Sequence, residues 1–227
     1  MRKNKSAETT VEEYLVKEIL NGKIEANTML KPERELAEAL GYSRPVIHKA
    51  IIRLEARGLL TIIPRRGVRV NDFRQSGKLG ILEIIYDMYH TGISRKLNVS
   101  MLVFIQNNLE AILETICSGD LGRRLECCSV QAECSYETGE DVFKWMHTYA
   151  LYCANPVYPM LINEFKTGIV NVGNAMLQGS ERQSFIQLLI ELNFLLASGQ
   201  VKDLKNKIQW LFVFIERHWL GREEDEK

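Results

Sequence analysis

The sequence predicts a mainly α-helical protein with a winged helix-turn-helix at the N-terminus and an all-α helical bundle behind it. Short amphipathic segments with a tight turn between them precede two β-branched segments, which are joined by Pro64-Arg65-Arg66-Gly67. From residue 80 onward apolar residues recur at helical spacing with little strand-like alternation. Between the two parts, residues 71–82 are polar and contain glycine, as is typical of a linker. We therefore expect a winged helix-turn-helix domain at 1–73 and an all-α helical domain at 80–222.

Charge and cysteine content bound the class of protein. The 227 residues include 29 Lys/Arg and 29 Asp/Glu, but residues 1–73 hold 14 of the basic and only 10 of the acidic side chains. This asymmetry indicates different partners for the two parts.

No apolar run follows the basic N-terminus and no stretch of about 18 apolar residues occurs, so we expect no signal peptide and no membrane partner. Five cysteines, an odd number, fit the reduced thiols of a cytoplasmic protein. Cys127, Cys128 and Cys134 lack the paired spacing of a zinc site.

Three helices and a hairpin are expected in the N-terminal part. The first helix should follow Thr9-Thr10 and end at Asn21-Gly22. Pro32 suits the first turn of a second helix, which should end at Gly41. Ser43 is a suitable N-cap for the third helix. Segments 59–63 and 68–70 should then form the two strands of the wing.

The third helix and the wing carry side chains suited to double-stranded DNA. The N-terminal residues of a recognition helix reach base edges in the major groove, where Arg forms two hydrogen bonds with guanine. Arginines on a wing reach phosphates or the minor groove. Any one of these side chains alone is consistent with an ordinary solvated charge, but their ordered combination favours DNA binding. The candidate DNA-binding residues are Arg34, Ser43, Arg44, Pro45, Val46, His48, Lys49, Arg65, Arg66 and Gly67.

The stretches "PERELAEALGYSR", "AIIRLEARGLL" and "RRGVRV" resemble the winged-helix domain of GntR-type bacterial transcription regulators over residues 9–73. The resemblance implies DNA contacts from Arg34, Arg44, His48 and the wing 65–67. It also implies a homodimer, whose two-fold symmetry predicts a palindromic operator. The family usually has Arg where His48 stands and Glu where Lys49 stands, and these departures bear on the operator sequence.

Helices in the second part are expected around 101–116, 143–150, 157–172, 185–196 and 201–219. "VNDFRQSGKLGILE" and "YCANPVYPMLINEFKTG" resemble the FadR-type branch of the GntR family, whose eponymous member responds to fatty acyl-CoA. The resemblance implies that the bundle binds a small-molecule effector.

Many bundles of this branch hold a metal through one Asp and three His, and that pattern can be tested here. Counting nine positions back from Asn155 gives Met146, and Gly199 as a landmark places the other two positions at Leu189 and Leu211. No Asp occurs at 97–108, where the acidic ligand would belong. Because Met and Leu cannot replace imidazole, we expect no metal and no cofactor. A shifted alignment that uses His147 and His218 is the alternative.

The expected ligand-pocket residues are Gln106, Met146, Tyr149, Leu189 and Leu211. An apolar pocket suits a long acyl chain, which contributes about 0.8 kcal/mol per buried CH₂. The same side chains are equally consistent with core packing. The acyl-CoA binder of the branch has Arg where Gln106 stands and tyrosines where Ile169 and Met176 stand, so a fatty acyl-CoA or another ligand with an apolar chain is expected.

Two other functions stay open at this point: a metal-dependent carboxylate-sensing regulator, and a ligand-independent DNA-binding scaffold. An enzyme is not expected, because none of the sequences GxGxxG, GxxxxGK[ST], GxSxG or HExxH occurs.

Overall fold

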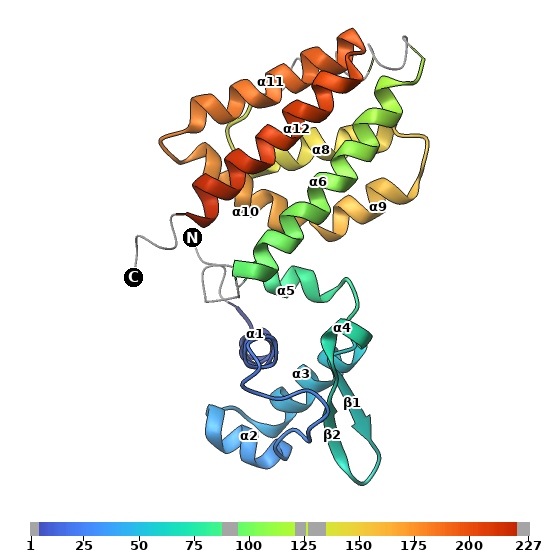
Figure 1. Ribbon diagram of the computed structural model, residues 1–227. Coiled ribbons are helices and arrows are strands. Elements are labelled where there is room, and N and C mark those ends of the chain that lie inside the picture. The colour runs from blue at the N-terminus through green and yellow to red at the C-terminus, as the bar shows by residue number, and fades with distance from the viewer. Residues whose placement is uncertain (1–4, 88–94, 121–125, 127–134, 222–227) are drawn as a thin grey trace. The chain divides into compact units, whose positions relative to one another are not determined.

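The chain forms two compact units, Met1–Ser94 and Arg95–Lys227 (Figure 1). The computed structural model describes residues 5–87, 95–120, 126 and 135–221. A winged helix-turn-helix is followed by a helical bundle, so the predicted fold class is confirmed. Cys127, Cys128 and Cys134 lie outside the described residues.

The first three helices are α1 (Ala7–Leu20), α2 (Glu33–Leu40) and α3 (Arg44–Ala56). Helix α1 begins earlier than expected because the Ser6 hydroxyl accepts a hydrogen bond from the Thr9 backbone N–H at 3.2 Å. Pro32 is the N-cap of α2 rather than a residue of its first turn. Gly41 ends α2 at φ 72°, the left-handed conformation that a glycine adopts without strain.

The wing consists of antiparallel strands β1 (Leu60–Ile63) and β2 (Gly67–Val70). The segment before α2 pairs with the far side of β2, since the Leu30 N–H donates to the Val68 carbonyl at 2.8 Å. At the exposed tip, Arg65 has φ 63° and Gly67 has φ 114°. The base of the wing is therefore held on both sides of β2, while its tip is presented to solvent.

Two short helices follow the wing: α4 (Phe73–Ser76) and α5 (Ile81–Asp87). Helix α5 packs against α1, and its residues Ile84 and Ile85 are buried. The sequence placed the segment from residue 80 in the bundle, whereas the structure places α5 with the N-terminal unit. The reason is that the apolar face of α5 covers α1, a contact between segments about 70 residues apart.

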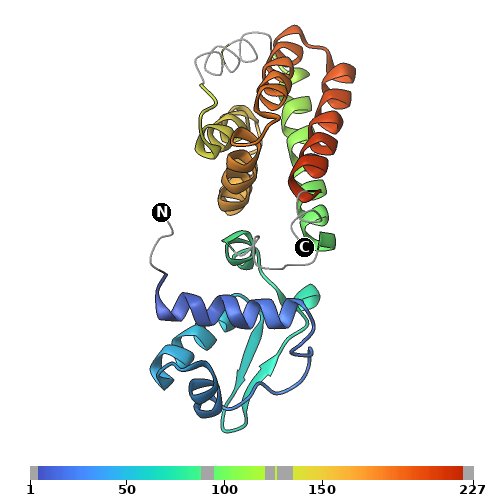
Figure 2. The same ribbon diagram turned by 90° about the vertical axis from the view of Figure 1, so that its left-hand side faces the viewer.

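The bundle consists of six helices within the described residues, and the last of them continues into a π-helical turn (Figure 2). The most extensive packing joins α8 to α10, α11 to α12, and α12 to α6. The elements are α6 (Arg95–Cys117), α8 (Gly139–Tyr152), α9 (Val157–Glu164), α10 (Lys166–Leu177), α11 (Arg182–Ser198), α12 (Val201–Ile215) and the turn η2 (Glu216–Leu220).

The single helix expected at 157–172 is two helices, α9 and α10, with Phe165 between them. Phe165 is 3% exposed and its ring centroid lies 5.3 Å from that of Phe104 on α6. The apolar spacing continues across this change of direction, which is why periodicity alone did not reveal it. None of the helices in the described ranges is long and apolar enough to cross a bilayer.

Candidate DNA-binding surface and bundle interior

Helix α3 has one buried face and one exposed face. Ile47, Ala50, Ile51 and Leu54 have no exposed surface and fix the helix to the core. The opposite face presents the candidate DNA-binding residues of this helix and its N-cap: Ser43, Arg44, Pro45, His48 and Lys49 are exposed, and Val46 is half-buried. Ser43 stands at the N-cap, but its hydroxyl makes no capping hydrogen bond.

Three of the candidate DNA-binding side chains pair with carboxylates at the surface. Such exposed ion pairs contribute little to stability, so a phosphate can replace the carboxylate that pairs with Arg34 or Lys49 at little cost. The pairs are Arg34 Nε–Glu38 Oε1 at 3.1 Å, His48 Nδ1–Glu33 Oε1 at 2.8 Å and Lys49 Nζ–Glu8 Oε1 at 3.6 Å. A hydrogen bond from its own backbone N–H holds the pKa of Glu8 below the ordinary value, and the Ser6 hydroxyl and Lys49 lower that pKa further.

Arg44, Arg65 and Arg66 differ from these three residues. All three are exposed, and among the described residues no ion pair involves any of them. Arg44 opens α3, and the two wing arginines lie at the β1–β2 turn, whose remaining residue Gly67 is also exposed. These side chains are therefore available to an anionic partner without breaking an internal contact.

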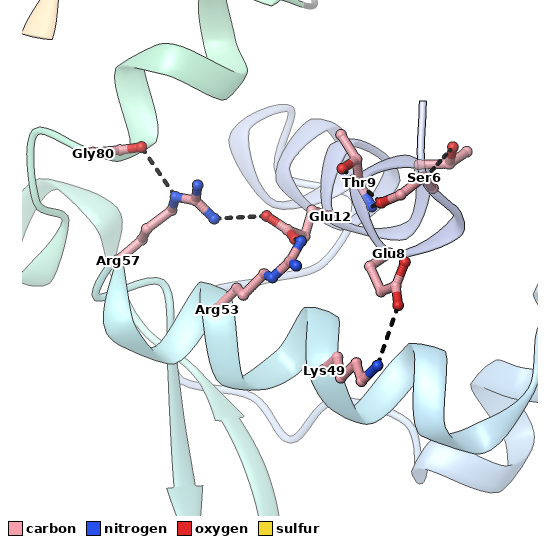
Figure 3. A network of polar contacts seen from close by, with 9 residues as sticks. Ser6, Glu8, Thr9, Glu12, Lys49, Arg53, Arg57 and Gly80 are labelled. Atoms are coloured by element: carbon pink, nitrogen blue, oxygen red, sulfur yellow. Dashed lines mark hydrogen bonds and ion pairs between the residues drawn. The ribbon is translucent and has the colours of Figure 1, made fainter. Parts of the chain in front are cut away.

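A buried carboxylate fixes α3 from behind (Figure 3). Glu12 on α1 is 3% exposed, and its two carboxylate oxygens accept hydrogen bonds from Arg53 at 2.8 Å and Arg57 at 2.6 Å. Both arginines belong to the C-terminal part of α3 and its cap. The hydrogen bond with Glu12 raises the pKa of Arg53 above its usual value. The network holds α3 at a defined position on α1.

The same end of α3 is attached to the segment that precedes α5. The Arg57 Nε donates to the Gly80 carbonyl at 3.0 Å, and the Lys78 N–H donates to the Arg57 carbonyl at 3.0 Å. Gly58 has φ +80°, and a Cβ there would lie 1.9 Å from the Ser76 carbonyl oxygen. The recognition helix, α1 and the start of α5 consequently form one hydrogen-bonded assembly.

Glu12→Gln should lower the free energy of unfolding of the N-terminal unit by about 2 kcal/mol, because two charge-assisted hydrogen bonds lose their charged acceptor. All three tryptophans belong to the other unit, so protection of α1 and α3 amides in hydrogen exchange is the suitable measurement. Glu8→Gln is the matched control and should change this protection little, because the Lys49–Glu8 pair lies at the surface. Equal protection in wild type and Glu12→Gln would contradict the role of the network.

The bundle interior contains four of the five candidate pocket residues. Met146 and Tyr149 on α8, Leu189 on α11 and Leu211 on α12 are each at most 3% exposed. Gln106 on α6 is only partly buried and donates to Glu110 at 3.0 Å. The first four therefore belong to the buried interior of the bundle, and Gln106 lies at its edge.

A polar cluster within the bundle was not predicted from the sequence. The Asn193 Oδ1 on α11 accepts hydrogen bonds from the indole N–H of Trp145 at 2.8 Å and from the Tyr149 hydroxyl, and its amide nitrogen donates to the Tyr136 hydroxyl at 3.4 Å. The Trp145 and Tyr149 rings meet edge to face at 5.2 Å. A single amide, Asn193, inside the otherwise apolar segment 192–196 was the available signal. This cluster fixes the orientation of Tyr149 in the candidate pocket.

The histidines of the shifted alignment do not form a metal site with other described residues. His147 lies on α8 against the Phe143 ring at 5.3 Å, and His218 lies in η2 against the Phe214 ring at 4.5 Å. In the described part of the chain, no group of three or more His, Cys, Asp or Glu is arranged to hold a metal ion.

Comparisons with known proteins agree with this architecture. Residues 7–70 match the family described as "Bacterial regulatory proteins, gntR family". A "Fatty acid metabolism regulator protein" of Shewanella amazonensis is 31% identical over 208 residues, which cover 85% of this chain and 83% of the relative. The chain belongs to the GntR family. A second GntR relative of the same name, from Shewanella oneidensis, is 27% identical over 226 residues and covers 94% of this chain and 90% of the relative.

A solved structure has a similar fold over nearly the whole chain. Lar of Listeria monocytogenes, which controls expression of the agr system in that organism, superposes with a TM-score of 0.60 at 19% identity. The superposition covers 96% of this chain and 98% of Lar, and it supports the fold alone. The predicted GntR membership, with FadR-type relatives, is confirmed. This GntR protein is a DNA-binding transcription regulator with a ligand-sensing C-terminal domain, and its family is not one of enzymes.

Proposed function

We propose that this regulator binds a palindromic operator as a homodimer. Its affinity for the operator would change when a ligand with a long acyl chain, such as a fatty acyl-CoA, binds in the bundle. The observation that carries the effector class is the apolar interior at Met146, Leu189 and Leu211, in a chain whose relatives are named fatty acid metabolism regulators. Each buried CH₂ of an acyl chain would contribute about 0.8 kcal/mol. Such a regulator would act in the cytoplasm, where the bacterial chromosome lies.

The DNA contacts proposed for α3 and the wing follow from exposure and charge. Arg44 would read a base edge in the major groove, with Ser43, Pro45, Val46, His48 and Lys49 around it. Arg65, Arg66 and Gly67 would lie against the backbone or minor groove, and Arg34 would reach a phosphate or an adjacent base. Exposed arginines without an internal partner support this assignment more strongly than any one motif.

A dimer is supported by apolar side chains left at the surface of the bundle. Phe194 on α11 is 68% exposed and Trp210 on α12 is 67% exposed. Aromatic side chains of this exposure are common in protein–protein interfaces. A two-fold axis would place two copies of α3 on successive major grooves of a palindrome.

The metal-dependent alternative does not fit the residues present. Met146, Leu189 and Leu211 offer no nitrogen or oxygen donor at the three histidine positions of the branch. The effector proposal therefore involves no metal.

Native mass spectrometry and thermal unfolding of the full-length protein test the proposal together. We expect a dimer, an increase in Tm with a C16 acyl-CoA, and no increase with CoA alone, because the acyl chain would supply the binding energy. Operator affinity should change with the acyl-CoA and not with CoA. If the protein is a dimer but acyl-CoA changes neither its Tm nor its operator affinity, the ligand-independent scaffold is favoured. A monomer would contradict the two-fold arrangement.

A further inference from the structure

His48 lies on the exposed face of α3, one turn after Arg44. Its side chain is 53% exposed. A recognition helix presents its N-terminal turns to the base edges of the major groove, so a protein that inserts α3 there brings both residues to the bases. This step depends on the DNA contacts proposed above.

Glu33 determines which ring nitrogen of His48 carries the proton. The Nδ1 of His48 lies 2.8 Å from Oε1 of Glu33, the first residue of α2. A carboxylate only accepts hydrogen bonds, so Nδ1 must donate. In a neutral imidazole the second nitrogen, Nε2, is then an acceptor. In the neutral state of His48, Glu33 thereby leaves the outer nitrogen with a lone pair instead of a proton.

The donors and acceptors in the major groove determine which bases this lone pair can bind. Only cytosine, through its N4 amino group, and adenine, through its N6 amino group, offer a donor there. Guanine O6 and N7 and thymine O4 are acceptors and cannot pair with it. We propose that His48 is a specificity-determining residue that reads the exocyclic amino group of a cytosine or an adenine, and that Glu33 is the positioning residue that makes it an acceptor.

The location of Glu33 supports a role in specificity instead of affinity. A carboxylate beside the DNA-binding face repels phosphates and so weakens binding to every sequence equally. Fixing one tautomer of His48 changes the ratio of affinities between sequences, and only that ratio distinguishes operators. A measurement of the ratio therefore separates the two effects.

In vitro selection from a random duplex pool, with the full-length wild type and His48→Arg, identifies the base pair that residue 48 reads. We expect the two selected operators to differ at one base pair in each half-site, because arginine offers only donors. At that pair, purine in place of adenine, or a pyrimidinone without N4 in place of cytosine, removes the amino group. Either replacement should lower the affinity of the wild-type protein for the operator at least about fivefold. If His48→Arg selects guanine there, 7-deazaguanine should lower the affinity of that variant, because it lacks the N7 acceptor.

Glu33→Gln tests the positioning role. A glutamine both donates and accepts, so it no longer fixes the tautomer, and the preference at this base pair should fall at least about fivefold without a loss of non-specific affinity. Glu38→Gln is the matched control: it removes the carboxylate 3.1 Å from Arg34 and should leave this preference unchanged. Identical operators for wild type and His48→Arg would overturn the role of His48, and an unchanged preference in Glu33→Gln would overturn that of Glu33. A wild type that selects no sequence would instead contradict the proposed DNA contacts themselves.

Discussion

Arg44→Ala should reduce operator binding to the level of non-specific DNA. An arginine that pairs with guanine contributes about 1–3 kcal/mol of discrimination, and a two-fold operator loses two of them. The affinity should therefore fall roughly 30-fold or more. Because Arg44 is exposed and no described residue forms an ion pair with it, its removal should leave the fold intact. Fluorescence anisotropy with the selected operator and with a scrambled duplex measures both affinities.

Two further variants separate the contribution of base contacts to operator affinity from that of positive charge in general. Arg74→Ala removes an arginine whose side chain is 77% exposed and bound to Asp72, and it should leave operator affinity nearly unchanged. Replacing Arg65 and Arg66 together by alanine should lower the affinity for the operator and for the scrambled duplex by the same factor. The affinity should also depend less steeply on salt concentration, because binding with fewer phosphate contacts releases fewer counterions. If Arg44→Ala kept the wild-type preference for the operator, the assignment of α3 as the recognition helix would be wrong.

Local signals made the N-terminal unit predictable. Glycines mark where helices end, and Gly22 and Gly41 do have the positive φ that such an end requires. The wing followed from two β-branched segments around a turn, and its register depends on only a few neighbouring residues. Signals of this kind are contained within a window of ten residues, and the sequence displays them directly.

Contacts between distant segments could not be predicted in the same way. The pairs of Glu12 with Arg53 and Arg57 join residues 41 and 45 positions apart, and each side chain by itself looks like a solvated charge on a helix. The Asn193 cluster joins residues 44 to 57 positions apart. Periodicity identifies which face of a helix is buried but not which helix covers it, so the placement of α5 on α1 also had to come from the structure.

Helices α8 and α10 approach each other closely at two glycines. A Cβ on Gly139, the first residue of α8, would lie 1.9 Å from the Val170 carbonyl oxygen, and one on Gly173 would lie 2.9 Å from the Gly139 Cα. The Gly139 N–H donates to the Asn174 Oδ1 at 2.8 Å, so a hydrogen bond also joins the start of α8 to a side chain of α10. Any side chain at Gly139 must push these helices apart.

Gly139→Ala should therefore destabilise the bundle by about 3 kcal/mol or more, because a carbonyl on a packed helix cannot move aside as a flexible side chain can. Unfolding in urea, followed by fluorescence of the three tryptophans of this unit, measures the change. Equal stability of Gly139→Ala and wild type would contradict the close approach. Because α8 carries Met146 and Tyr149, the response to an acyl-CoA should be lost together with this contact, while the recognition helix of the other unit keeps its fold.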